Sequence, residues 1–149
     1  MSSERAAEST SHELVEEAFE LGLRVRAPSF GELVAEAGRA ISKLMLAGLA
    51  GGAGGAGDAS GEWRRFEIQA ADRAAVLVNW LNEIIFHAET EHWIPTEFNV
   101  ESASDSAIEI SARGVTVEEA PTLLKAATFH GLEIKETDGT LLVEIMLDV

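Results

Sequence analysis

The last nine residues read Leu141-Leu142-Val143-Glu144-Ile145-Met146-Leu147-Asp148-Val149 and predict an apolar strand that ends on an acid. Carboxylates held by a buried strand are costly unless a positive group lies beside them. A bound cation would supply that charge, and calcium prefers oxygen ligands of this kind. We therefore expect a cation site at Asp148 and the Val149 terminus. Glu20, just before the first strand, becomes a third oxygen donor if the two strands are neighbours.

Two helices are predicted upstream of this strand. Ser29 and Glu32 form a capping box that starts a helix over 29–46, and Asp72 can cap a second helix over 72–87. The second helix has an apolar stripe at helical spacing that includes Trp80. Both helices should therefore bury one face against a sheet.

The remaining pattern is typical of strands, with Asp138-Gly139 as a hairpin turn before the last one. The expected strands are Leu21–Ala27, Glu62–Ala70, Glu97–Val100, Ala107–Ala112, Thr122–Lys135 and Thr140–Asp148. Pro95 is expected to break the connection after the second helix. The sequence predicts an α+β fold, with two helices packed on a mixed, mainly antiparallel sheet of about six strands.

One segment, His12–Glu20, is ambiguous. Thr10 and Glu13 could form a capping box, and the apolar residues that follow have helical spacing. Local propensity alone therefore predicts a helix here.

Composition narrows the class of protein. A chain of 149 residues with 46% hydrophobic residues fits one domain spanning 1–149, with flexible segments expected at 1–11 and in the Gly-rich loop 47–61. There is no Cys, which excludes disulfides and thiolate metal sites and suits a cytoplasmic location. The sequence contains neither an apolar run of transmembrane length nor a signal-peptide core.

The net charge of −15 argues against a broad nucleic-acid-binding face, because the phosphate backbone would be repelled. A basic protein or a cation is the better electrostatic partner. Gly52, Gly54 and Gly57 match a phosphate-loop pattern, but they follow a helix and precede a strand, the reverse of the required order. We interpret them as a loop.

Two further groups could carry chemistry. The segment His87–His92 holds two imidazoles and two carboxylates, which allows a metal cluster or a solvated helix terminus. His130 lies in an apolar segment, where a structural role competes with a functional one. No Ser-His-Asp set can be placed by spacing, so nucleophilic catalysis has no support.

Three segments resemble the archease family, in the same order and over about Leu14 to Val149. Ala75–Phe86 (AVLVNWLNEIIF) resembles the family helix L-L-V-E-W-L-N-E-L-L-Y. Lys125–Glu133 (KAATFHGLE) resembles K-A-x-T-Y-H-G-L, and Ile145–Val149 (IMLDV) resembles the terminal V-I-L-D-V. The resemblance also implies that Leu14 to Glu20 is extended, because tertiary context can override propensity.

The resemblance implies a small protein, not itself an enzyme, that activates the tRNA-splicing RNA ligase RtcB by promoting its guanylylation and multiple turnover. It also implies an acidic calcium site, carried here by Glu20 and Asp148 together with Val149. Glu17, Lys125 and His130 lie at positions of its motifs and are the other candidates for partner interaction or function.

The N-terminal signature departs from the family pattern E-H-T-A-D-I-G-L. Glu17 stands at the signature His and Glu20 at the signature Asp. Glutamate can ligate calcium, but its extra methylene moves the carboxylate by about one bond length. The alternative function is therefore a divergent metal- or protein-binding module without ligase activation. A hydrolase using Glu17, Glu20 and His130 is a third hypothesis, although nothing positions a nucleophile.

Overall fold

The computed structural model describes residues 10–17, 20–49, 60–121, 124–129 and 131–149. The elements are, in chain order, β1 (Ser11–Glu17), β2 (Glu20–Ala27), α2 (Phe30–Ala47), β3 (Ser60–Gln69), α3 (Arg73–Glu91), β4 (Trp93–Ala103), β5 (Ala107–Thr116), β6 (Ala126–Thr128), β7 (Ile134–Thr137) and β8 (Thr140–Asp148). Two helices with antiparallel strands confirm the predicted α+β class. The predicted single sheet is in fact two sheets.

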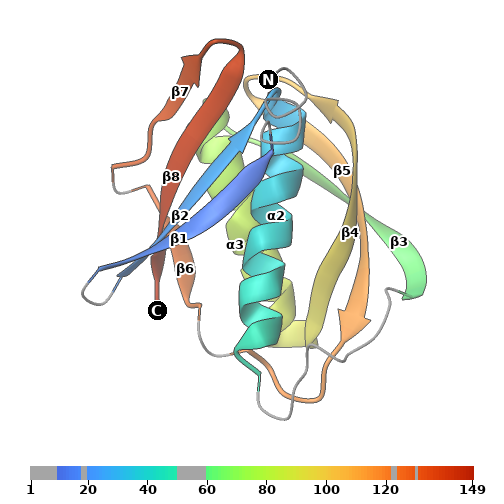
Figure 1. Cartoon of the computed structure of the whole chain (residues 1–149). Coiled ribbons are helices and arrows are strands. Elements are labelled where there is room, and N and C mark those ends of the chain that lie inside the picture. Colours follow the sequence, from blue (N-terminus) through green and yellow to red (C-terminus); the bar gives the residue numbers. More distant parts are fainter. Residues whose placement is uncertain (1–9, 18–19, 50–59, 122–123, 130) are drawn as a thin grey trace.

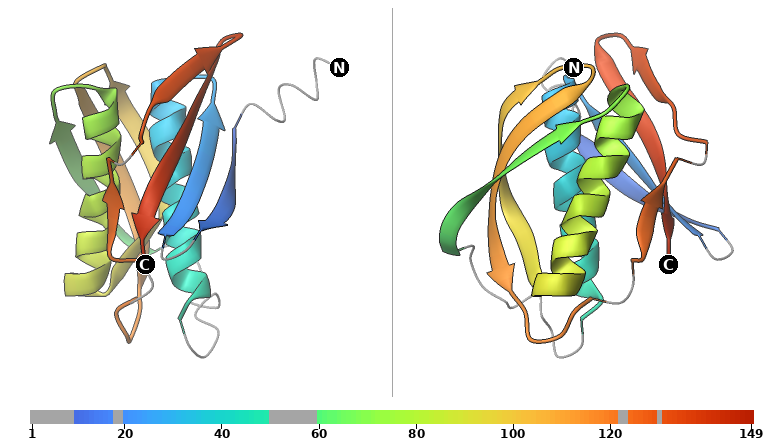
Figure 2. Two further views of the ribbon diagram at one scale, coloured as in Figure 1. Left: turned by 90° about the vertical axis from the view of Figure 1, so that its left-hand side faces the viewer. Right: turned by 180° about the vertical axis from the view of Figure 1, so that it is seen from behind.

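The larger sheet has five strands in the order β1-β2-β8-β6, and β7 also pairs with β8. The smaller sheet has the order β3-β5-β4, and every strand pair of both sheets is antiparallel. Figures 1 and 2 show α2 and α3 between the two sheets. Each sheet therefore buries one face against the helices and turns the other face outward.

The ambiguous N-terminal segment is extended, as the family resemblance implied and local propensity did not. Leu14 pairs with Leu23, and Glu17 pairs with Glu20, in the β1–β2 hairpin. Pairing with β2 gives the β1 backbone its hydrogen bonds, which outweighs a small difference in helix propensity.

Both helices begin where their caps predicted. The Glu32 N–H donates to Ser29 Oγ at 3.2 Å, and the Ala75 N–H donates to Asp72 Oδ1 at 2.9 Å. The second helix continues to Glu91, one turn beyond the predicted end at His87, and stops at His92 in the left-handed region with φ 56°. Helix α3 is therefore long enough to reach from one end of the sheets to the other (Figure 1).

The core lies between the sheets around Trp80, which is fully buried. Its indole Nε1–H donates to the Val34 carbonyl at 3.3 Å, and its ring contacts Phe66 and Phe98 edge-on at 5.5 and 6.0 Å. Sheet residues facing inward complete the core, including Leu23, Val25, Ile108, Ile110, Val143, Ile145 and Leu147.

Pro95 lies inside β4 instead of breaking the chain there, which corrects the sequence prediction. It pairs with Gly114 of β5, where the register shifts between Pro95 and Glu97. A Cβ on Gly114 would lie 2.1 Å from the Ile94 carbonyl oxygen, so only glycine fits beside this irregular pair. A proline is tolerated because β4 is an edge strand.

The predicted strand Thr122–Lys135 is not continuous. Its described parts form β6 and β7, which pair with opposite ends of β8. The hairpin turn before β8 is confirmed, since Asp138 and Gly139 have φ of 53° and 77°. Most of the segments predicted to be flexible, 1–11 and 47–61, and the glycine pattern at Gly52–Gly57 fall outside the described residues, but β1 already begins at Ser11 and β3 at Ser60.

Candidate functional site

Glu20 and Asp148 lie directly opposite each other where β2 begins and β8 ends. Opposite residues of an antiparallel pair point to the same face, with Cβ atoms about 4.5–5.5 Å apart. The neighbouring strands that the cation-site hypothesis required are therefore present. Asp148 also pairs with Ala126 of β6, and the Lys125 N–H donates to the Asp148 carbonyl at 2.9 Å. The end of β8 is thus held between two strands.

The two carboxylates have no cationic partner within the described part of the chain. Asp148 is exposed and Glu20 is partly buried, and neither belongs to an ion pair. In a protein of net charge −15 they repel each other and their surroundings. Their oxygen chemistry fits a hard cation, because both groups are ligands that calcium accepts.

The described residues do not by themselves complete a metal-binding shell. Within the ranges given above, no three His, Asp or Glu side chains gather closely enough to hold an ion. Glu20 and Asp148 form a pair, and further ligands would be main-chain oxygens, water or a partner's groups. Val149 follows Asp148 directly and is 39% exposed.

Asn82 is a site-positioning residue that the sequence analysis missed. Its Oδ1 accepts from the Ala127 N–H at 2.8 Å, and its Nδ2 donates to the Ala127 carbonyl at 3.1 Å. The two bonds join α3 to β6, the strand beside Asp148. Asn82 lies in the helix segment and Ala127 in the Lys125–Glu133 segment. Because both segments resemble motifs of the same family, that resemblance could have indicated a contact between Asn82 and Ala127.

The other predicted site residues have mixed outcomes. Glu17 lies opposite Glu20 in the β1–β2 hairpin, so it belongs to the same end of the sheet. Lys125 is exposed and joins β8 through its backbone. His130 lies outside the described residues.

The His87–His92 segment is a helix end, and its two imidazoles have separate partners. His87 hydrogen-bonds Glu83 at 3.1 Å and forms a short contact with Glu91, while His92 Nδ1 contacts the Glu118 carbonyl oxygen at 3.0 Å. The His87 side chain is only 16% exposed, and its ring lies edge-on to Phe66 and Trp93. The expectation of a solvated terminus is therefore wrong for His87.

Glu91 completes this structural cluster. The hydrogen bond that Arg64 donates lowers the pKa of the Glu91 carboxyl most, and the contact with His87 lowers it further. The Arg64 guanidinium also stacks over the Trp93 ring at 4.1 Å. These partners account for the side-chain polar groups of His87 and Glu91.

The sequence of this chain matches the model of the archease protein family over residues 12–149. The chain belongs to the archease family. The resemblance of the helix, the Lys125–Glu133 segment and the terminal strand is thereby confirmed. The residues matched include both Glu20 and Asp148.

One curated archease and two solved structures are similar to this chain. The archease of Methanothermobacter thermautotrophicus is 32% identical over 96 residues, which cover 60% of this chain and 69% of that protein. The solution structure of Methanobacterium thermoautotrophicum protein 1598 has 24% identity and a TM-score of 0.68, covering 93% of this chain and 98% of the other. A crystal structure of a Thermotoga maritima archease, described as a possible chaperone, has 16% identity, a TM-score of 0.62 and the same coverage. Both structures share the fold.

Neither helix of the described archease chain combines the length and apolar character that crossing a bilayer requires.

Proposed function

We propose that this archease activates the tRNA-splicing RNA ligase RtcB. It promotes guanylylation of the ligase and allows repeated turnover in the cytoplasm, and it does not ligate RNA itself. The observation that carries the proposal is the pairing of Glu20 with Asp148 at the end of the sheet in a member of this family. The two residues are those that the family resemblance assigns to the acidic site.

A divalent cation, calcium by the chemistry of its ligands, is the proposed cofactor. Glu20, Asp148 and the main-chain oxygens of Val149 would hold it. The bound ion would supply positive charge where two carboxylates face each other, and it would offer open coordination positions to a partner. Asn82 supports the site by fixing β6, which in turn pairs with Asp148.

The proposed partner is a protein with a basic surface. The net charge of −15 attracts such a surface and repels RNA, so RNA would be reached through the ligase. Association should therefore weaken as ionic strength rises, because salt screens exposed charges over about 8–10 Å.

The test is multiple-turnover RNA ligation by the cognate ligase with and without this protein. The protein should raise the turnover number and the fraction of guanylylated ligase, and D148A and E20A should reduce both. E136A is the matched control, because Glu136 is an exposed β7 carboxylate without an ion-pair partner in the described structure. An unchanged turnover number with parent protein refutes activation.

Calorimetry with calcium tests the cofactor separately. D148A and E20A should each lose most calcium binding, while E136A should bind as the parent does. Removing one carboxylate relieves repulsion, so both site variants should stay folded. Calcium binding that survives both substitutions would place the ion elsewhere.

The second candidate function is a metal- or protein-binding module without ligase activation. It is favoured by Glu17 and Glu20 standing where the family signature has His and Asp. A pull-down with the cognate ligase separates the two candidates. Retention of the ligase with increased turnover supports the activator, whereas calcium binding without ligase retention supports the module.

A further inference from the structure

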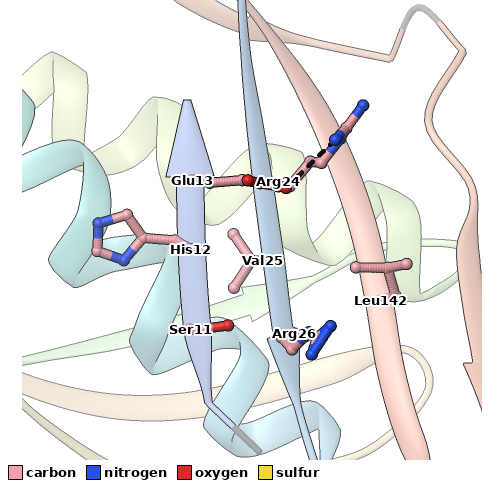
Figure 3. A pocket seen from close by; sticks show the side chains of 7 residues that line it. All are labelled: Ser11, His12, Glu13, Arg24, Val25, Arg26 and Leu142. Carbon is pink, nitrogen blue, oxygen red and sulfur yellow. Dashed lines mark hydrogen bonds and ion pairs between the residues drawn. The ribbon is translucent and has the colours of Figure 1, made fainter. Parts of the chain in front are cut away.

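The outer face of the five-stranded sheet carries a row of four residues at the end remote from Glu20 and Asp148. Ser11 pairs with Arg26, Arg26 with Leu142, and Leu142 with Lys135, so the four side chains share one face. We call them the basic row. Figure 3 shows the side chains of Ser11, Arg26 and Leu142 on three neighbouring strands. In the left view of Figure 2, no described helix lies over the outer face of β1, β2 and β8.

The basic row holds cations that have no carboxylate partner in the described chain. Elsewhere in the described chain, six arginines form ion pairs: Arg24, Arg39, Arg64, Arg65, Arg73 and Arg113. Four described cations form none: Arg26, Lys43, Lys125 and Lys135. Two of these four therefore lie on the same short row, in a protein with more than twice as many acids as bases.

The next row along the strands shows the contrast. Arg24 donates to Glu144 at 2.6 Å and to Glu13 at 3.2 Å, and these hydrogen bonds raise the pKa of the Arg24 guanidinium. Its charge is therefore neutralised within the sheet. Arg26 lies two residues further along β2 and has no such partner among the residues that the structure describes, so its donors are available to an external acceptor.

The surface is hollowed on both sides of Leu142. One hollow of about 500 Å³ includes Arg26, and another of about 290 Å³ includes Lys135. Arg24 and Leu142 line both hollows. Leu142 is 43% exposed, so it presents an apolar contact between the two free cations. Both volumes are within or close to the range typical of side-chain and ligand pockets.

We propose that the basic row docks an acidic segment of a partner protein. Carboxylates of the segment would accept hydrogen bonds from Arg26 and Lys135, and an apolar side chain between them would contact Leu142. The two cations lie two strands apart, or about 9–10 Å between their backbones, which suits two acidic side chains that flank an apolar one. Arg26 lies six residues from Glu20 along β2, about 20 Å, so this site is separate from the proposed cation site and does not rest on it.

A protein segment fits better than a nucleic acid. A phosphate backbone carries evenly spaced charges, and the −15 chain repels all of them beyond the two that the row could accept. The flanking carboxylates Glu13 and Glu144 restrict the positive surface to this row. An exposed leucine between the cations also offers nothing to a phosphate but stabilises an apolar side chain.

The test is fluorescence anisotropy with two labelled probes, a Glu-Ser-Leu-Ser-Glu peptide blocked at both ends, which carries two carboxylates, and a short oligouridylate. The peptide should bind the full chain at low ionic strength and dissociate as salt is added. R26E and K135E should each weaken peptide binding by about tenfold or more, because an attractive contact becomes repulsive. L142A should weaken it about threefold to tenfold, through lost apolar contact.

K43E is the matched control. It changes the charge of the chain by the same amount as R26E, at an exposed and unpaired lysine of α2. All variants change surface side chains, and circular dichroism verifies that they are folded. The proposal is overturned if K43E and R26E weaken binding equally, if the peptide does not bind the parent, or if oligouridylate binds through Arg26 more tightly than the peptide.

Discussion

The outer faces of the two sheets use charge in opposite ways. On the three-stranded sheet, Arg65 pairs with Glu109 at 3.1 Å, and Arg113 pairs with Glu97 at 3.1 Å. Arg113 also lies over the exposed Trp63 ring at 4.9 Å. On the five-stranded sheet, Arg26 and Lys135 lie on either side of Leu142 without an ion-pair partner among the described residues, and Glu20 and Asp148 are likewise unpaired at the other end of β2 and β8.

The two sheets therefore differ in how far the charged side chains on their outer faces form ion pairs with one another. Water solvates exposed charges at little cost, so the separated charges of the larger sheet do not need partners for folding. They produce an electric field across one face, and fields of this kind attract and orient partners. The two outer faces share one core and one chain, and both sites proposed above lie on the larger sheet.

The largest expected effect comes from the core that both faces share. W80A should cost about 3–5 kcal/mol of unfolding free energy, because it removes the largest fully buried side chain between the sheets. W63A is the control, since Trp63 is 46% exposed on the outer face and should cost far less. Denaturant unfolding gives both values. If W80A loses less than about 1 kcal/mol, the two sheets do not depend on this common core.

A smaller effect is expected at the junction between α3 and the larger sheet. N82A should cost about 1–3 kcal/mol, because it leaves the partly buried N–H and carbonyl of Ala127 without their partners. It should also weaken calcium binding, since β6 supports Asp148.

N79A is the control for that change. Asn79 lies one turn earlier on α3 and is exposed, so its replacement has the same effect on helix propensity without breaking the junction. Equal unfolding free energies for the two variants, measured with urea, would show that the side chain of Asn82 does not hold β6.

The smallest expected effect on the unfolding free energy comes from removing a paired or an unpaired arginine from the two outer faces. R65A should lower the unfolding free energy by about 0.5–1 kcal/mol, because Glu67 and Glu109 lose their shared cation. R26A should be neutral within about 0.5 kcal/mol, because Arg26 has no such carboxylate within the described residues. Both variants change the net charge equally, so the difference in melting temperature isolates local pairing. A loss for R26A as large as for R65A would remove the distinction between the faces.

The helices and the last hairpin could be predicted from the sequence because their signals are local. Ser29 and Asp72 cap helices through atoms three residues away, and Asp138-Gly139 supplies the positive φ values that its turn requires. The segment that forms β1 was ambiguous because its residues favour a helix locally. Its pairing with β2, for example of Leu14 with Leu23, outweighs that propensity. The break predicted at Pro95 was wrong because a local rule about proline does not show that β4 is an edge strand.

For the candidate site too, some features could be predicted from the sequence and others depend on the tertiary structure. The sequence by itself determined the oxygen donors Glu20 and Asp148, the acidic charge of the chain and the two amphipathic helices, because these follow from residue identity and spacing. Only the tertiary structure decided that Glu20 faces Asp148, that Asn82 holds β6, and that Arg26 and Lys135 flank Leu142. The contacts of Asn82 with Ala127, Glu20 with Asp148 and Arg26 with Leu142 join residues 45 or more positions apart, whereas Lys135 reaches Leu142 through the local β7–β8 hairpin. Strand register, which no local pattern encodes, fixes which of them meet.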